Sequence, residues 1–227
     1  MEANMDTKKV GGEKPSLLGI IISPGLQFER MKMSEKVWGM FFLVALLQGL
    51  VGAFGTYVMN TSPEGIKMKK ELGGLVGQGS LTLEIIYGAI SGFVEAMIGA
   101  LFVAGIYKVF IMLFGNDTSY KTLLTIIVYT NIVLIIGGLI NTILNLIFGG
   151  GATEYTSLGP LFTEGSFAYE IGTTVEVFYV WNLVLIWLGL QITAGLSKVK
   201  AAIPIMILFI IFAIIILITN ILQGMFS

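Results

Sequence analysis

Five apolar stretches of this chain are each long enough to cross the hydrocarbon core of a lipid bilayer, which needs about 20 residues of helix. Only the second stretch contains charged residues, Glu95 and Lys108. The five stretches are residues 37–59, 85–114, 123–148, 177–196 and 201–225. The sequence therefore predicts an all-α integral membrane protein built as a bundle of five transmembrane helices.

The composition supports this class and excludes several chemistries. Charged residues are 12% of the chain, whereas about 25% is usual in soluble domains, so lipid must cover most of the surface. The chain has no histidine and no cysteine, which removes imidazole bases, thiol nucleophiles and the usual zinc sites. We expect no catalytic residues, no metal and no cofactor, and the net charge of −1 gives no case for nucleic acid.

Lysine and arginine are distributed unequally between the two sides that five spans define. One side carries only Lys67, Lys69 and Lys70. The other side carries the remaining ten: Lys8, Lys9, Lys14, Arg30, Lys32, Lys36, Lys108, Lys121, Lys198 and Lys200. Basic residues favour the cytoplasmic side, so we expect a multi-pass protein of the cell membrane with a cytoplasmic N-terminus and an extracytoplasmic C-terminus. The connections 60–84 and 149–176 then face outward, and we interpret both as loops.

Residues 1–36 form a cytoplasmic segment ahead of the transmembrane domain, residues 37–227. Ser23 and Pro24 are typical of a helix start, so a short helix is expected before the first span. It could lie in the headgroup layer, with Arg30, Lys32 and Lys36 contacting lipid headgroups. It could equally pack under the bundle as a core helix.

Glu95 lies inside the second span, where an ionisable side chain is costly. Tyr87, Ser91 and Glu95 recur every four residues and so share one helix face. The functional interpretation is an ion, proton or substrate site. The structural interpretation is a hydrogen bond that fastens helices together.

Carboxamide side chains in the third and fourth spans extend this candidate intramembrane site. Asparagine in hydrocarbon needs hydrogen-bond partners, so these residues are expected to face inward, toward each other and Glu95. They are Asn131, Asn141, Asn145, Asn182 and Gln191. Interhelical hydrogen bonding and a permeation path are the two alternatives.

A ridge of small residues runs beside the Glu95 face on the second span. Such ridges let helix backbones approach closely in membranes. The ridge consists of Gly88, Gly92, Ala96, Ala100 and Ala104, spaced by four, and it predicts helix packing.

Three segments of the chain resemble the Ypt-interacting-protein (Yip) domain family. They are IIISPGLQFERMK before the first span, VYTNIVLIIGGLI in the third span, and WNLVLIWLGLQITAGLSKVKAA, which covers the fourth span and its exit. The resemblance implies five spans. Eukaryotic members of the Yip family bind prenylated GTPases in vesicle traffic. The acidic Leu-Tyr-Gly-Pro motif of those members is missing from this N-terminal segment. That argues against GTPase binding, and the chain looks more like the prokaryotic branch.

These observations favour a non-enzymatic membrane organiser or adaptor. Its partners would be the lipid bilayer and a second copy or another membrane protein. The alternative is a small transporter or channel around Glu95 and the inward asparagines.

Overall fold

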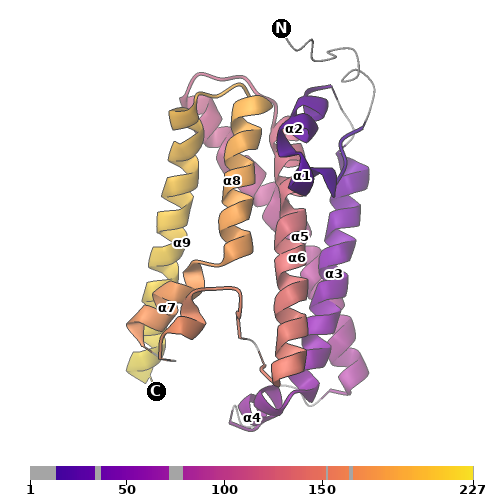
Figure 1. Cartoon of the computed structure of the whole chain (residues 1–227), viewed down its shortest axis with the longest axis vertical. Coiled ribbons are helices and arrows are strands. Elements are labelled where there is room, and N and C mark those ends of the chain that lie inside the picture. Colours follow the sequence, from indigo (N-terminus) through magenta and orange to yellow (C-terminus); the bar gives the residue numbers. More distant parts are fainter. Residues whose placement is uncertain (1–13, 34–36, 72–78, 152, 164–165, 227) are drawn as a thin grey trace, which may run out of the picture.

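The computed structural model describes residues 14–33, 37–71, 79–151, 153–163 and 166–226, and these residues form helices joined by short connections (Figure 1). Four helices, α3, α5, α6 and α9, are long and apolar enough to cross a membrane, and the shorter α8 is also apolar. The predicted all-α membrane fold is thereby confirmed. The elements are α1 (Gly19–Ile22), α2 (Pro24–Lys32), α3 (Trp38–Thr61), α4 (Pro63–Glu71), α5 (Leu81–Leu113), α6 (Tyr120–Phe148), η2 (Gly159–Leu161), α7 (Phe167–Thr174), α8 (Val177–Ile192) and α9 (Lys198–Phe226).

The fourth apolar stretch makes a shorter helix than the sequence predicts. We expected residues 177–196, but α8 ends at Ile192. The chain then turns through Gly195, whose φ of +68° is readily adopted only by glycine. Sixteen residues give α8 a length of about 24 Å at 1.5 Å per residue, less than the bilayer core of about 30 Å.

The connections 60–84 and 149–176 are not plain loops, and this prediction was wrong. The first contains α4, which begins at Pro63, a residue whose fixed φ suits the first turn of a helix. The second contains η2 and α7, and the Ser166 hydroxyl caps α7 by accepting from the Tyr169 amide at 3.1 Å. In Figure 1, α7 lies below the start of α8 and beside α9. These helices were not predicted from the sequence because they are too short to show as long apolar runs.

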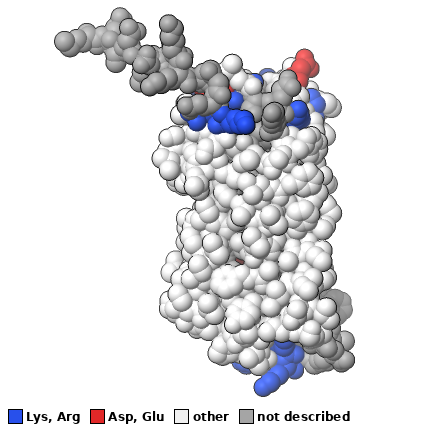
Figure 2. Space-filling model, turned by 90° about the vertical axis from the view of Figure 1, so that its right-hand side faces the viewer, with Lys and Arg blue, Asp and Glu red and all other residues white. Residues whose placement is uncertain are grey.

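Basic side chains lie at the two ends of the molecule and not in the belt between them on the face shown in Figure 2. The turn between α5 and α6 meets the turn between α8 and α9 at one end of the molecule. There the side-chain amide of Asn116 donates to the Ala194 carbonyl at 3.0 Å. Lys108 reaches this end from within α5 by donating to the Thr118 carbonyl at 2.8 Å. At the other end, Lys69 pairs with Glu84 at 2.6 Å.

Helices α3 and α5 pack backbone against backbone through glycine. A Cβ atom added to Gly52 would come within 2.5 Å of the Gly88 carbonyl oxygen. A Cβ on Gly92 would come within 2.9 Å of the Gln48 carbonyl oxygen. The two glycines of the predicted ridge are buried and face α3 here, Ala100 and Ala104 are buried farther along α5, and Ala96 is half-buried.

The segment before α3 is a short helical hairpin, α1 and α2, that packs into the bundle. Helix α2 begins at Pro24, as predicted, although the Ser23 side chain makes no capping bond. Ile20 and Phe28 are fully buried, and the Thr193 hydroxyl on the α8 side donates to the Phe28 carbonyl at 3.1 Å. Of the two alternatives, the contacts therefore favour the core-packing helix.

The side of this hairpin that faces away from the bundle remains exposed. Leu26 is 40% exposed, and Lys32 pairs with Glu29 on the surface at 2.8 Å. Arg30 is half-buried on α2, and Lys36 lies outside the described residues. Headgroup contacts by these basic residues stay a prediction.

Candidate intramembrane site

Four polar side chains, one from each of four helices, line one cavity. They are Gln48 of α3, Glu95 of α5, Asn131 of α6 and Asn182 of α8. The cavity has a volume of about 750 Å³, within the range of about 300–1,000 Å³ typical of small-molecule sites. Residues of α9 close it on the remaining side, and most of its other lining is apolar or aromatic.

Asn182 is the most deeply placed of the four. Its side chain is 3% exposed, and its Nδ2 donates to no described group. A buried amide donor without a partner costs about 1–3 kcal/mol, so such groups in a native protein call for an explanation. A molecule in the cavity that offers an acceptor would remove that cost.

Glu95 marks the opening of the cavity. Its side chain is exposed although the residue also lines the cavity, so the cavity reaches the molecular surface at this point. Glu95 lies about 21 Å along α5 from Leu81, near the middle of the helix. The cavity therefore opens sideways, toward lipid.

The carboxyl of Glu95 has no protein partner within the described part of the chain. No described hydrogen bond or ion pair includes it, and no lysine or arginine is among the residues that line the cavity. The structural interpretation, in which Glu95 fastens helices together by a hydrogen bond, thus lacks its bond here. A charged group at the centre of a membrane helix costs about 2.5–3.5 kcal/mol on insertion scales, and a counterion in the cavity would offset it.

The remaining polar candidates do not reach this cavity. Tyr87 is 75% exposed, and the Ser91 hydroxyl donates to the Gly88 carbonyl of its own helix at 3.2 Å. Gln191 lies near the other end of α8 from Val177 and donates to the Trp187 carbonyl at 3.1 Å. The predicted stripe on α5 therefore contributes only Glu95.

Asn141 and Asn145 hold the connection between α6 and α8 onto the end of α6. Asn145 donates to the Thr153 carbonyl at 2.8 Å and accepts from the Thr153 amide at 3.1 Å. Asn141 donates to the Thr156 hydroxyl at 2.7 Å and accepts from the Thr156 backbone amide at 3.1 Å, and the same hydroxyl donates to Glu176 at 2.6 Å. These asparagines satisfy the backbone of the connection and lie apart from the Glu95 cavity.

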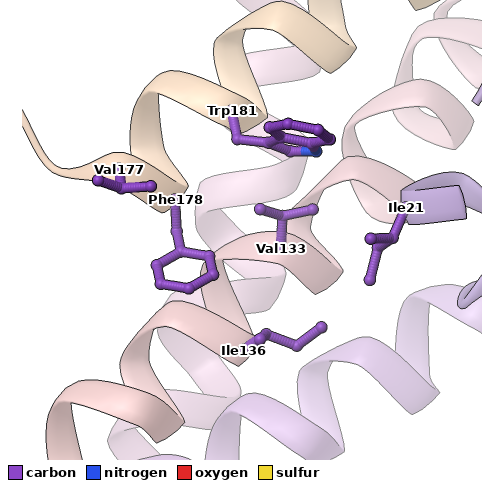
Figure 3. Close-up of a pocket in the computed structure, with 6 residues that line it drawn as sticks. All are labelled: Ile21, Val133, Ile136, Val177, Phe178 and Trp181. Carbon is purple, nitrogen blue, oxygen red and sulfur yellow. The ribbon is translucent and has the colours of Figure 1, made fainter. Parts of the chain in front are cut away.

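A second, smaller pocket of about 240 Å³ lies on another side of α8 (Figure 3). Three helices supply its lining, which is entirely apolar: Ile21, Val133, Ile136, Val177, Phe178 and Trp181. It has no polar group that would orient a ligand, so the Glu95 cavity is the stronger candidate site.

Gln48 and the aromatic residues of the cavity were not predicted from the sequence. Gln48 is the only strongly polar side chain in the middle of an otherwise apolar first span, and that isolation was a usable signal. Tyr107 and Tyr179 gave none, because tyrosine is common near span ends. No group of three or more acidic residues that could hold a metal ion occurs in the described chain.

Apolar helices of membrane-crossing length, with basic side chains at the two ends of the face in Figure 2, define a polytopic α-helical membrane protein. Comparison with known families gives a more specific class. The family model of the Yip1 domain matches residues 18–219, so the chain belongs to the Yip1 domain family, as the resemblance implied. It is also 31% identical to the membrane protein YknW of Bacillus subtilis (strain 168), over 92% of each chain. No solved structure matches it.

Proposed function

We propose that this protein is a non-enzymatic membrane organiser or adaptor that holds a second component of the membrane in the Glu95 cavity. The observation that carries the proposal is the unpartnered, buried Nδ2 of Asn182 in a cavity that opens at Glu95. Three of the four polar groups are carboxamides, which serve as hydrogen-bond donors and acceptors and not as nucleophiles or general bases. Such a set favours binding over chemistry.

The cavity also supports transport as a second candidate function. An acidic group at mid-depth, beside carboxamides on three other helices, is a common feature of ion and proton pathways. The described geometry favours binding, because the cavity opens sideways at Glu95 and the outer end of α6 is covered by the connection that Asn141 and Asn145 hold.

Flux and co-purification together separate these functions. In liposomes we expect no ion or solute flux from the wild type. In nanodiscs cut from native membranes, we expect a component that the wild type retains and Glu95→Leu loses. The control is Ser91→Ala, one turn away on α5 and outside the cavity, which should retain the component. A wild-type flux that disappears in Glu95→Gln would replace the binding role by transport.

We also propose that the end formed by α2 and the α5–α6 turn is cytoplasmic, because basic residues concentrate there. The absence of cysteine makes this simple to test with single introduced cysteines. A membrane-impermeant maleimide should label Lys70→Cys on α4 in intact cells, and Lys121→Cys only after permeabilisation. The reverse pattern would show the opposite orientation, and labelling of both in intact cells would show that these ends share one side.

A further inference from the structure

We propose that the Glu95 cavity selects amphipathic amines, with the ligand's ammonium group at the Glu95 carboxylate and its apolar body against α9. This assignment rests on the proposed binding function and adds to it the chemical class of the ligand. Amphipathic here means a cationic nitrogen joined to a hydrocarbon chain, a molecule that dissolves in the bilayer and can enter from the side.

The charge of the lining supports a cationic ligand. Glu95 is the one charged residue among those that line the cavity, and it lies where the cavity opens. A cation there would pair with the carboxylate in a medium of low dielectric constant, where such attraction is strong. A carboxylate or phosphate headgroup would meet a like charge and no basic side chain, so the same geometry disfavours anionic lipids.

Aromatic rings provide a second, independent reason to expect a cation. Five aromatic side chains line the cavity: Phe102, Tyr107, Phe110, Tyr179 and Phe212. The rings of Tyr179 and Phe212 lie 5.9 Å apart at an angle of 43°, which joins α8 to α9 at the cavity wall. Ring faces attract ammonium groups, and the attraction is strongest where water is excluded.

Asn182 defines a further requirement of the ligand. Its Nδ2 can only donate, so the ligand needs an acceptor, such as a hydroxyl or carbonyl oxygen, for this atom. The apolar residues Leu208, Ile211 and Ile215 of α9 offer a surface for a hydrocarbon chain. A long-chain amine that also carries a hydroxyl group fits all three features.

The test uses three probes with the same chain and different head groups: dodecylamine, dodecanol and dodecanoate. Each is titrated into the full-length purified protein in a neutral detergent, and the midpoint of thermal unfolding gives an apparent affinity. We expect dodecylamine to stabilise the protein most and dodecanoate least. Glu95→Gln should lower the apparent affinity for dodecylamine about tenfold and leave the apparent affinity for dodecanol unchanged. Ser91→Ala should respond as the wild type does.

The neutral alcohol also reports on folding, because a Glu95→Gln protein that still binds dodecanol has kept its cavity. If that variant does not fold, Asn182→Leu provides the second test, and it should weaken an amino alcohol of the same chain length more than dodecylamine. Equal stabilisation by all three probes, or an amine preference that survives Glu95→Gln, would overturn the amine assignment. The binding role is tested separately, because it would fail if the wild type showed a flux in liposomes. Failure of the amine assignment is therefore distinguishable from failure of the binding role.

Discussion

Replacing Gly88 by valine is expected to separate α3 from α5 and to destabilise the protein by about 1–3 kcal/mol, the usual cost of overpacking. A Cβ at this position would come within 2.8 Å of the Gly52 carbonyl oxygen, a backbone atom that cannot turn aside. The two helices must then move apart and lose contacts along much of their length. Thermal unfolding in detergent, followed by circular dichroism, measures the change.

Gly105→Val is the matched control, because Gly105 lies on the same helix and a Cβ there would have no atom within 4 Å. Both variants make the same change in helix propensity, so the difference between them isolates helix packing. We expect Gly105→Val to unfold close to the wild-type temperature. Equal midpoints for the two variants would show that the α3–α5 contact contributes little to stability.

Replacing Phe28 by alanine is expected to release the α1–α2 hairpin from the bundle. The Phe28 ring is fully buried, and a Cβ added to Gly189 of α8 would come within 2.8 Å of it. Losing a buried phenylalanine typically costs about 3–5 kcal/mol in protein cores. A cost of about 3 kcal/mol would raise amide hydrogen exchange across α2 by at least about a hundredfold.

Leu26→Ala serves as the control for this second experiment, since Leu26 is on α2 but 40% exposed. Its exchange should stay within a few-fold of the wild type. Fast exchange throughout α2 in the wild type would contradict a packed hairpin and favour a helix that rests in the headgroup layer.

The class of fold was predictable from the sequence because membrane spans are defined by simple physical requirements. In lipid, the backbone N–H and C=O groups of a long apolar run can all be hydrogen-bonded within that run only if it is a helix. Accordingly, α3, α5 and α6 begin and end close to the predicted bounds. The end of α8 was not predictable in this way, since the apolar run continues through the turn at Gly195. Hydropathy does not record a change of backbone direction.

The candidate site was predictable only in part, for a similar reason. Periodicity placed Tyr87, Ser91 and Glu95 on one face, but which part of that face meets a cavity depends on the neighbouring helices. Asn131 and Asn182 lie at a depth where they line the same cavity as Glu95. Asn145 lies one turn from the end of α6, where loop backbone groups are available as partners.

The limited length of α8 has a consequence for the surrounding bilayer. Helices α5 and α6 match or exceed a hydrocarbon core of about 30 Å, whereas α8 does not. Hydrophobic mismatch would then be largest on this side of the protein, and we expect acyl chains to be shortest there. A change in membrane thickness would therefore act unequally on the sides of the protein, and the bilayer deformation would be greatest beside α7 and α8.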